Sequence, residues 1–125
     1  MIRTHLYGVF YGTRAALRHM TPQRSGSIIN ISSILGVQPA GGAPDYAAAS
    51  EVAHLGIRVN AVCPGYVDTP LLKPFDADVR SAITMRIGMG RMATAEEIAE
   101  LVRFLAGPDS SYSTGEVYTA SGGYE

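Results

Sequence analysis

The sequence predicts an α/β protein in which parallel strands alternate with helices. Two short runs rich in β-branched residues, SIINISS at 27–33 and IRVNAVCPG at 57–65, are apolar on both faces, as strands buried in a parallel sheet are. Stretches with helical spacing of apolar residues lie before, between and after these runs. Strands that alternate with helices in this way indicate a layered α/β structure.

The chain is expected to begin with a helix over residues 2–20. Pro22 and the Gln-Arg-Ser-Gly run that follows it are expected to end this helix. Its apolar positions recur three or four residues apart, which is the spacing of an amphipathic helix. These positions are Leu6, Val9, Phe10, Thr13, Leu17 and Met20.

The first strand, at 27–33, leads into GVQPAGGAP, whose glycines and prolines predict a loop. An Ala-rich helical segment over 45–54 then closes at Gly56. The second strand follows directly, and Pro64 and Gly65 are expected to stop it. The connection between the two strands is therefore expected to be short and partly helical.

Residues 70–90 have a loosely helical character. Thr94 is expected to cap a clear helix, because Glu96 and Glu97 follow in its first turn and apolar residues line one face. Those apolar residues are Ile98, Leu101, Val102 and Leu105, and GPDSS ends the helix. The segment GEVYTASGG closes the chain as a third strand that runs into a Gly-rich tail.

The composition is that of one ordinary globular domain, with 125 residues of which 46% are hydrophobic. A net charge of -1 gives no broad basic surface, so neither nucleic acid nor an anionic membrane is an expected partner. No apolar stretch approaches the roughly 20 residues that span a bilayer, and no export signal is evident. Cys63 is the only cysteine, which excludes an internal disulfide and fits a buried strand-end residue in a cytoplasmic protein.

Six segments carry more information in combination than any one of them alone. They are NISS at 30–33, Tyr46, IRVNAVCPG at 57–65, Thr69 within PGYVDT, GRMATAEEIA and the terminal GEVYTASGG. In this order the chain resembles the carboxyl-terminal half of the classical short-chain dehydrogenase/reductase family. The resemblance implies a single partial domain over 1–125: a Rossmann-like doubly wound parallel sheet of about three strands with flanking helices, lacking the amino-terminal half. It also implies hydride transfer between NAD or NADP and a small-molecule alcohol or ketone.

The resemblance implies that Ser33 binds the substrate oxygen and that Tyr46, thirteen positions later, gives or takes the proton. Two hydroxyl donors that converge on this oxygen would stabilise the negative charge that develops when a carbonyl accepts hydride. In the family a lysine lowers the pKa of the tyrosine, and here Ser50 stands in its place. A free phenol has a pKa of about 10, so only about one in a thousand is ionised at pH 7.

Other cations are poor substitutes for the absent lysine. A positive charge at about 4 Å would stabilise tyrosinate by about 4 kcal/mol at an effective dielectric of 20, which a serine does not supply. Lys73 is the only lysine, and the resemblance puts it in the substrate-side segment. We expect Arg58 to begin a strand and to point to solvent. His5 stands where the family has a proton-relay asparagine, and we expect it to be a frayed, solvated side chain.

The predicted cofactor contacts are limited to the nicotinamide end. The family uses a Pro-Gly-x-x-x-Thr turn there, which corresponds here to Pro64, Gly65, Val67 and Thr69, although the same residues also fit plain strand termination. No G-x-x-x-G-x-G motif occurs to hold a pyrophosphate. We therefore expect this chain to lack most of the family's affinity for NAD or NADP. No metal site is predicted.

The connection after Tyr46 is shorter than the family pattern by about a dozen residues, or roughly 18 Å of helix. Such a crossover normally needs a dozen residues or more, so we expect strain or local disorder around 46–56. The large missing part suggests three hypotheses. The chain is an inert or weakly active half of an oxidoreductase, a non-catalytic subunit that pairs with full-length relatives, or a truncated record of an active enzyme. An apolar strand edge at SIINIS also predicts homo- or hetero-oligomers or aggregation.

Overall fold

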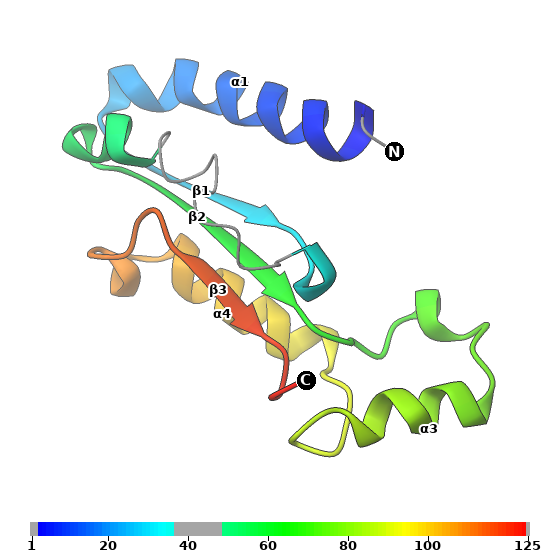
Figure 1. The fold of residues 1–125 in the computed structure, drawn as a ribbon. Coiled ribbons are helices and arrows are strands. Elements are labelled where there is room, and N and C mark those ends of the chain that lie inside the picture. The colour runs from blue at the N-terminus through cyan, green and yellow to red at the C-terminus, as the bar shows by residue number, and fades with distance from the viewer. Residues whose placement is uncertain (1–2, 37–48, 125) are drawn as a thin grey trace.

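The computed structural model describes residues 3–36 and 49–124. Its main elements, shown in Figure 1, form a three-stranded sheet with helices on both faces. The elements are η1 (Arg3–Tyr7), α1 (Gly8–Gln23), β1 (Gly26–Ile31), η2 (Ile34–Gly36), η3 (Ala53–Leu55), β2 (Ile57–Pro64), η4 (Pro70–Leu72), α3 (Ala77–Met85), α4 (Ala95–Ala106), η5 (Pro108–Ser110) and β3 (Val117–Ala120). No helix among the described residues is both long enough and apolar enough to cross a membrane.

The sheet has the order β1-β2-β3, and both pairs of strands are parallel. Gly26 pairs with Ile57 at one end of the first pair, and Ile31 with Val62 at the other. Figure 1 shows α1 on one side of the sheet and α4 on the other. The predicted α/β class with three parallel strands and flanking helices is therefore confirmed.

The central strand β2 forms the core of the protein. Its residues Ile57, Val59 and Val62 are fully buried, and Cys63 is buried as predicted. On the α1 side, Ile28 of β1 packs with Val59 against the helix. Because a strand with neighbours on both edges and both faces loses the most apolar surface to solvent, β2 contributes the largest share of the hydrophobic stabilisation.

A buried asparagine ties β2 to the segment that leads into β3. The Asn60 side chain is fully buried, and its Nδ2 donates to the Ser113 carbonyl oxygen at 2.9 Å. Its Oδ1 accepts a hydrogen bond from the Glu116 N–H at 3.2 Å. The Gly115 N–H donates to the Val59 carbonyl oxygen at 2.7 Å, so side chain and backbone of β2 fix the same turn. A buried amide that meets its partners in this way avoids the cost of an unpaired polar group.

The first helix differs from its prediction at both ends. It begins with a π-helical turn, and it continues through Pro22 to Gln23 before Arg24 adopts a left-handed conformation with φ 51°. Proline lacks an N–H and so removes one helical hydrogen bond, which is a small loss in a final turn. Of the predicted apolar stripe, Leu17 and Met20 pack against the core cluster, beside Ala16.

The segment before β2 is regular where it is described. Residues 49–52 are helical, and Gly56 closes the following 3-10 turn with φ 72°. A Cβ at Gly56 would lie 2.8 Å from the Arg24 carbonyl oxygen, so glycine is required there both by backbone angle and by space. No non-glycine residue of 49–56 has a positive φ, so the predicted strain is not found in these residues. The rest of the predicted 45–54 helix and the preceding loop lie outside the described residues.

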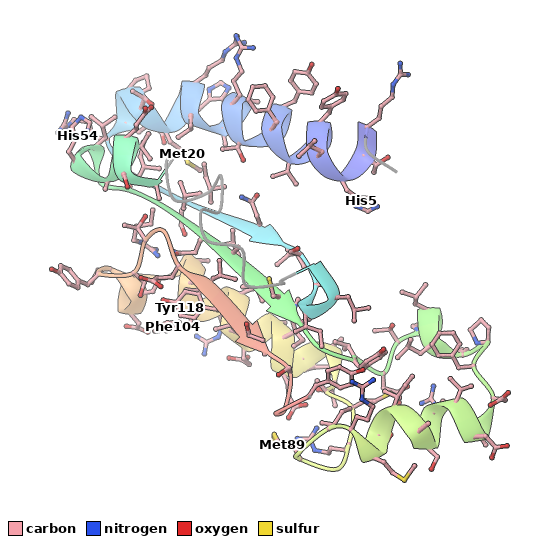
Figure 2. The ribbon with its side chains drawn as sticks, in the orientation of Figure 1. His5, Met20, His54, Met89, Phe104 and Tyr118 are labelled. Carbon is pink, nitrogen blue, oxygen red and sulfur yellow. The ribbon has the colours of Figure 1, made fainter. Side chains whose placement is uncertain are left out.

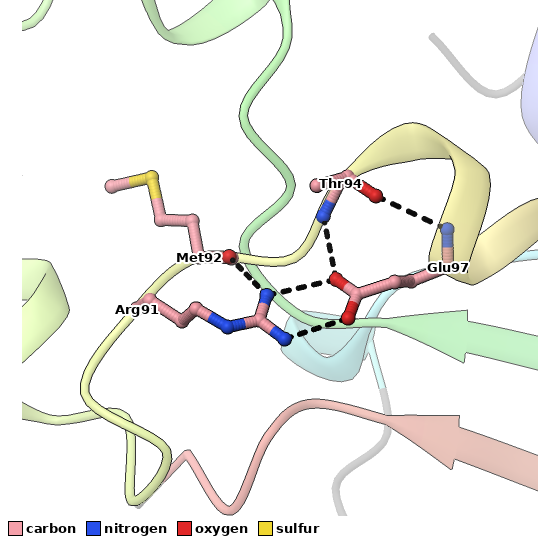
Figure 3. A network of polar contacts seen from close by, with 4 residues as sticks. All are labelled: Arg91, Met92, Thr94 and Glu97. Atoms are coloured by element: carbon pink, nitrogen blue, oxygen red, sulfur yellow. Dashed lines mark hydrogen bonds and ion pairs between the residues drawn. The ribbon is translucent and has the colours of Figure 1, made fainter.

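The helix α4 begins and ends as predicted, with a full capping box. Thr94 Oγ1 accepts a hydrogen bond from the Glu97 N–H, and the Glu97 carboxylate accepts one from the Thr94 N–H. Figure 3 shows that Arg91 joins this network with two hydrogen bonds to the same carboxylate, at 2.6 and 2.9 Å. These contacts lower the pKa of Glu97 to about 2, the hydrogen bond from Arg91 being the largest cause.

Arg58 does not point to solvent, and that prediction is wrong. Its guanidinium crosses to the carboxyl end of α4, where Nη1 donates to the Leu105 carbonyl oxygen at 2.8 Å and Nη2 to the Gly107 carbonyl oxygen at 3.0 Å. The last carbonyl groups of a helix lack partners within the helix and carry partial negative charge. Arg58 therefore acts as a tertiary cap for α4.

Candidate active site

The predicted site residues that the structure describes gather where the strands end. The Ser32 N–H donates to the Val62 carbonyl oxygen at 2.8 Å. Ser33, the next residue, therefore leaves the sheet beside the last residues of β2. Pro64 pairs with Ala120 of β3, and the Gly65 N–H donates to the Ala120 carbonyl oxygen at 2.9 Å. Because all three strands are parallel, their carboxyl ends meet at one edge, which is where ligands bind in open α/β sheets.

Ser33 is held by a local turn. Its Oγ accepts a hydrogen bond from the Leu35 N–H at 3.2 Å, and the side chain is half-buried. A hydroxyl that accepts in this way still has its own proton to donate. The geometry thus suits a group that donates a hydrogen bond to an incoming substrate oxygen.

The Pro64–Gly65 turn is tightly packed on the tail of β3. A Cβ at Gly65 would lie 2.8 Å from the Ser121 Cα, so only glycine fits without a backbone shift. The chain then runs beside the segment before α4, where Val67 pairs with Ala93. Thr69 precedes η4 in an extended conformation and does not cap it with its side chain. The predicted nicotinamide-side residues therefore form one continuous, ordered turn.

The segment after this turn is anchored by residues that sequence reasoning missed. The Tyr66 ring packs on Tyr124 with centroids 5.2 Å apart, and the Arg86 guanidinium lies 4.7 Å from the centre of the Tyr124 ring. The hydrogen bond with Tyr124 is the largest cause that raises the pKa of Tyr66, followed by burial. Arg80 also forms an ion pair with Asp68 at 2.8 Å. Tyr66 follows Gly65, and Tyr124 follows Gly122 and Gly123. A tyrosine after each of these glycine-containing turns was the sequence signal that could have revealed this packing.

A groove of about 1220 Å³ lies between α1 and β1. Ser33 and His5 both line it, together with apolar residues of α1, whereas the residues of the Pro64–Thr69 turn do not. His5 is exposed, as predicted, and Figure 2 shows it near the amino-terminal end of the first helix. The structure therefore places Ser33 between two features, the groove on one side and the turn on the other.

Among the described residues, the other positions considered in the sequence analysis lie apart from Ser33. Tyr46 lies outside the described residues. Ser50 is exposed in the helical residues before η3, and Lys73 is exposed at the end of η4. Arg58 lies at the opposite end of β2 from Ser33 because it pairs with Ser27 near the start of β1. Arg58 therefore lies away from Ser33.

The residues present fit only part of a dinucleotide cofactor. The turn from Pro64 to Thr69 offers a backbone bend at the strand ends and a Thr69 hydroxyl that does not cap η4, which suits a nicotinamide carboxamide. The sequence has no Gly-rich turn that would aim backbone N–H groups at a pyrophosphate. Within the described ranges, no three His, Cys, Asp or Glu side chains are grouped as metal ligands would be.

Comparison with known proteins decides the lineage. The family model described as enoyl-(acyl carrier protein) reductase matches residues 1–125. The chain belongs to the short-chain dehydrogenase/reductase family. It is 43% identical to the cis-4-hydroxycyclohexanecarboxylate dehydrogenase of Sinomonas cyclohexanicum, with 99% of this chain and 55% of that protein covered. It is 38% identical to the 3-oxoacyl-(acyl-carrier-protein) reductase of Thermotoga maritima, with 98% and 55% covered.

The chain thus spans about half the length of the curated short-chain dehydrogenases/reductases that it matches. The alignment with the Sinomonas enzyme runs over 136 residues, which exceeds the 125 residues of this chain. That enzyme therefore has residues within the matched stretch that have no counterpart here.

Solved structures show the same fold relationship. The structure of the TT0495 protein from Thermus thermophilus superposes with a TM-score of 0.87 at 35% identity, with 98% of this chain and 58% of that chain covered. ElxO, whose structure has NADP bound, superposes with a TM-score of 0.87 at 31% identity, with 99% and 56% covered. The partial Rossmann-like architecture is thus that of a short-chain dehydrogenase/reductase over about half its length.

Proposed function

We propose that this chain provides the carboxyl-terminal half of the catalytic unit of an NAD(P)-dependent oxidoreductase that acts on a secondary alcohol or ketone. In this proposal Ser33 binds the substrate oxygen, Tyr46 transfers the proton, and Pro64, Gly65, Val67 and Thr69 contact the nicotinamide end of the cofactor. The chain by itself is inert or weakly active, and it acts in a cytoplasmic setting as one partial domain over 1–125.

The observation that carries the proposal is the position of Ser33. Ser33 lies just past the end of β1, at the carboxyl edge of the sheet and beside the Pro64–Gly65 turn. Its hydroxyl accepts one hydrogen bond and keeps its own proton for donation. Hydride added to a carbonyl carbon leaves charge on the oxygen, and a fixed hydroxyl donor lowers the energy of that state. The Sinomonas and Thermotoga relatives act on matching chemistry by name, a ring hydroxyl in one and a 3-oxo group in the other.

The low activity of the chain alone follows from two missing groups. Bound NAD or NADP supplies the hydride, but without a pyrophosphate cradle most of the binding energy for the dinucleotide is absent. With serine at position 50, no ammonium lowers the pKa of a tyrosine. Each deficiency acts on a separate step, so correcting one does not correct the other.

The test has two stages. The purified chain is first assayed for oxidation of NADH and NADPH with a panel of ketones, beside its Tyr46→Phe variant, and both are expected to stay at background. The amino-terminal half of the Thermotoga maritima reductase, which this chain does not cover, is then fused in front of the chain. The lysine-bearing helix is restored in the same fusion. This fusion is expected to turn over and to lose turnover in Ser33→Ala and Tyr46→Phe. Turnover by the chain alone that Tyr46→Phe abolishes would refute its inertness, and an active fusion indifferent to both substitutions would refute the assigned roles.

A second function is favoured by a different observation, the open edge of β1. The strand has no neighbour on its outer side within the described ranges and has no charged residue or proline in its sequence GSIINI. Such an edge favours pairing with another chain. We therefore also propose a non-catalytic subunit that associates with other polypeptides, and co-purification with an intact relative tests it. A clean monomer in size-exclusion chromatography that captures no relative would count against it.

A further inference from the structure

The helix α3 is not held in place by a hydrophobic core. None of its residues is buried, and Figure 1 shows it beyond the carboxyl ends of β2 and β3. A helix that buries so little apolar surface gains little stability from packing, so a few specific contacts determine where it lies. In its first half these contacts come from Arg80, whose guanidinium binds Asp68 at 2.8 Å and the Leu72 carbonyl oxygen at 3.3 Å.

The carboxyl end of α3 is joined to the segment after β3 by backbone contacts. Ile87 forms an antiparallel bridge with Tyr124. The Gly88 N–H donates to the Gly123 carbonyl oxygen at 3.1 Å. A Cβ at Gly88 would lie 3.3 Å from the carbonyl oxygens of Gly122 and Gly123, so the two backbones pass each other closely. The residues just after α3 are thereby connected to those just after β3.

The Tyr124 side chain adds two contacts to this junction. Its ring packs on the ring of Tyr66, and the Arg86 guanidinium, at the end of α3, lies 4.7 Å from the ring centre. Both tyrosines are half-buried. The face of an aromatic ring carries partial negative charge, which attracts a guanidinium, and tilted ring pairs are favourable for the same electrostatic reason. One ring therefore links the turn that contains Tyr66 to the end of the helix that contains Arg86.

The turn just after β2 has backbone contacts of its own that do not involve this ring. The Gly65 N–H donates to the Ala120 carbonyl oxygen at 2.9 Å. The Ala93 N–H donates to the Tyr66 carbonyl oxygen at 3.0 Å, and the Asp68 N–H to the Ala93 carbonyl oxygen at 2.8 Å. Loss of the ring contacts should therefore release α3 and leave the backbone of the turn in place.

The position of α3 matters for a ligand at the carboxyl edge of the sheet, because ligands of open α/β sheets bind outside that edge. When only a fraction of the molecules has the helix in place, the apparent affinity falls by that fraction. We propose that Tyr124 is a positioning residue, whose ring contacts with Tyr66 and Arg86 hold α3 where the substrate binds. This inference rests on the proposed oxidoreductase function, to which it adds a residue that does not touch the substrate.

The first test follows backbone amide exchange of the full chain by NMR. Tyr124→Ala is expected to speed exchange of the amides in α3 by about tenfold and to leave those in β2 unchanged, because the ring contacts restrain only the helix. Tyr124→Phe keeps the ring and is expected to stay within about twofold of the parent chain. The matched control is Tyr112→Ala, since Tyr112 is fully exposed and its loss should leave α3 unaffected.

The second test uses the fusion with the amino-terminal half of the Thermotoga maritima reductase and the ketone that this fusion reduces fastest. Tyr124→Ala is expected to raise KM for the ketone by about tenfold and to leave kcat within about twofold, because bound ketone restores the position of α3. The KM for NADPH should change less, since the turn after β2 has its own backbone contacts. A general loss of folded protein would instead lower kcat at an unchanged KM. Thermal unfolding checks each variant, and Arg86→Met provides a milder change that keeps the Tyr124 ring.

Three outcomes would overturn the inference. These are unchanged exchange in α3 of both Tyr124→Ala and Arg86→Met, equal acceleration in Tyr112→Ala, or a lower kcat of the Tyr124→Ala fusion at an unchanged KM. A fusion that is inactive with Tyr124 in place counts against the oxidoreductase proposal instead. Amide exchange in the chain alone then still supports or overturns the hold of Tyr124 on α3, because that measurement needs neither NADPH nor turnover.

Discussion

Arg58 Nη1 lies 2.8 Å from Ser110 Oγ, although the two residues are 52 positions apart in the sequence. The Ser110 hydroxyl is buried, and its Oγ also lies 2.8 Å from the Phe104 carbonyl oxygen. Together with the bonds from Arg58 to Leu105 and Gly107, these contacts bind the carboxyl end of α4 to the start of β2. A single guanidinium thus sets how one helix docks on the sheet.

Replacing Arg58 with methionine should destabilise the protein by about 2 kcal/mol, because hydrogen bonds from a charged donor contribute about 1.5–3 kcal/mol and several are lost together. Arg58→Lys should recover part of this loss, since one ammonium cannot reach all three acceptors. Urea unfolding measures both. The matched control is Arg103→Met, which breaks an exposed ion pair with Glu100 and should cost much less. Equal losses at the two positions would contradict the capping role.

Gly65→Ala should destabilise the protein and displace the turn, because the new Cβ would stand 2.8 Å from the Ser121 Cα. The contrasting variant is Gly12→Ala in α1, where a Cβ meets nothing within 4 Å. That substitution should stabilise the helix by up to about 1 kcal/mol. Thermal unfolding compares the two variants, and a stabilised Gly65→Ala protein would show that the turn is not close-packed.

The capping network of α4 predicts a response to acid. The pKa of Glu97 is lowered from 4.5 to about 2 in the folded state, so its contribution is present above 4.5 and is lost as the pH falls toward 2. Glu97→Gln should therefore lower stability at pH 7 and have a smaller effect near pH 2. Unfolding curves at several pH values measure this difference. A loss of stability that is the same at pH 7 and pH 2 would exclude ionised Glu97 as its source.

Ser50→Lys in the chain alone should leave oxidation of NADPH at background. An ammonium at position 50 supplies one missing group, but the pyrophosphate contacts remain absent. In the fusion with the missing half of a relative, the lysine within its restored helix should matter, and changing it to methionine should reduce turnover. Appearance of turnover in the Ser50→Lys chain without any added half would refute the proposed need for the cofactor-binding part.

The elements of the fold were predictable because their signals are local. A β-branched run, a glycine that must be left-handed at Gly56 and a capping box at Thr94 are each visible within a few residues. The order of the six segments from NISS to GEVYTASGG also identified the family. The position of Ser33 at the end of β1 followed from the same strand assignment.

Other features depend on contacts between distant residues, which a single sequence does not reveal. From the sequence alone, Arg58 cannot be told from any other cation at the start of a strand. Its partner Leu105, at the end of α4, is 47 positions away along the chain. The packing of Tyr66 on Tyr124 joins the middle of the chain to its tail. Pro22 looks like a helix terminator, yet the loss of one hydrogen bond in a last turn is too small to move the helix end. The relation between Ser33 and Tyr46 stays a prediction because Tyr46 lies outside the described residues.

The buried Asn60 amide couples the formation of β2 to that of β3. Its Nδ2 and Oδ1 are satisfied only when the segment before β3 has docked, so β2 without β3 would carry an unpaired polar group in its interior. Closure of β3 and completion of β2 are therefore one cooperative event rather than two. The latter part of the chain should therefore form and dissolve as a unit.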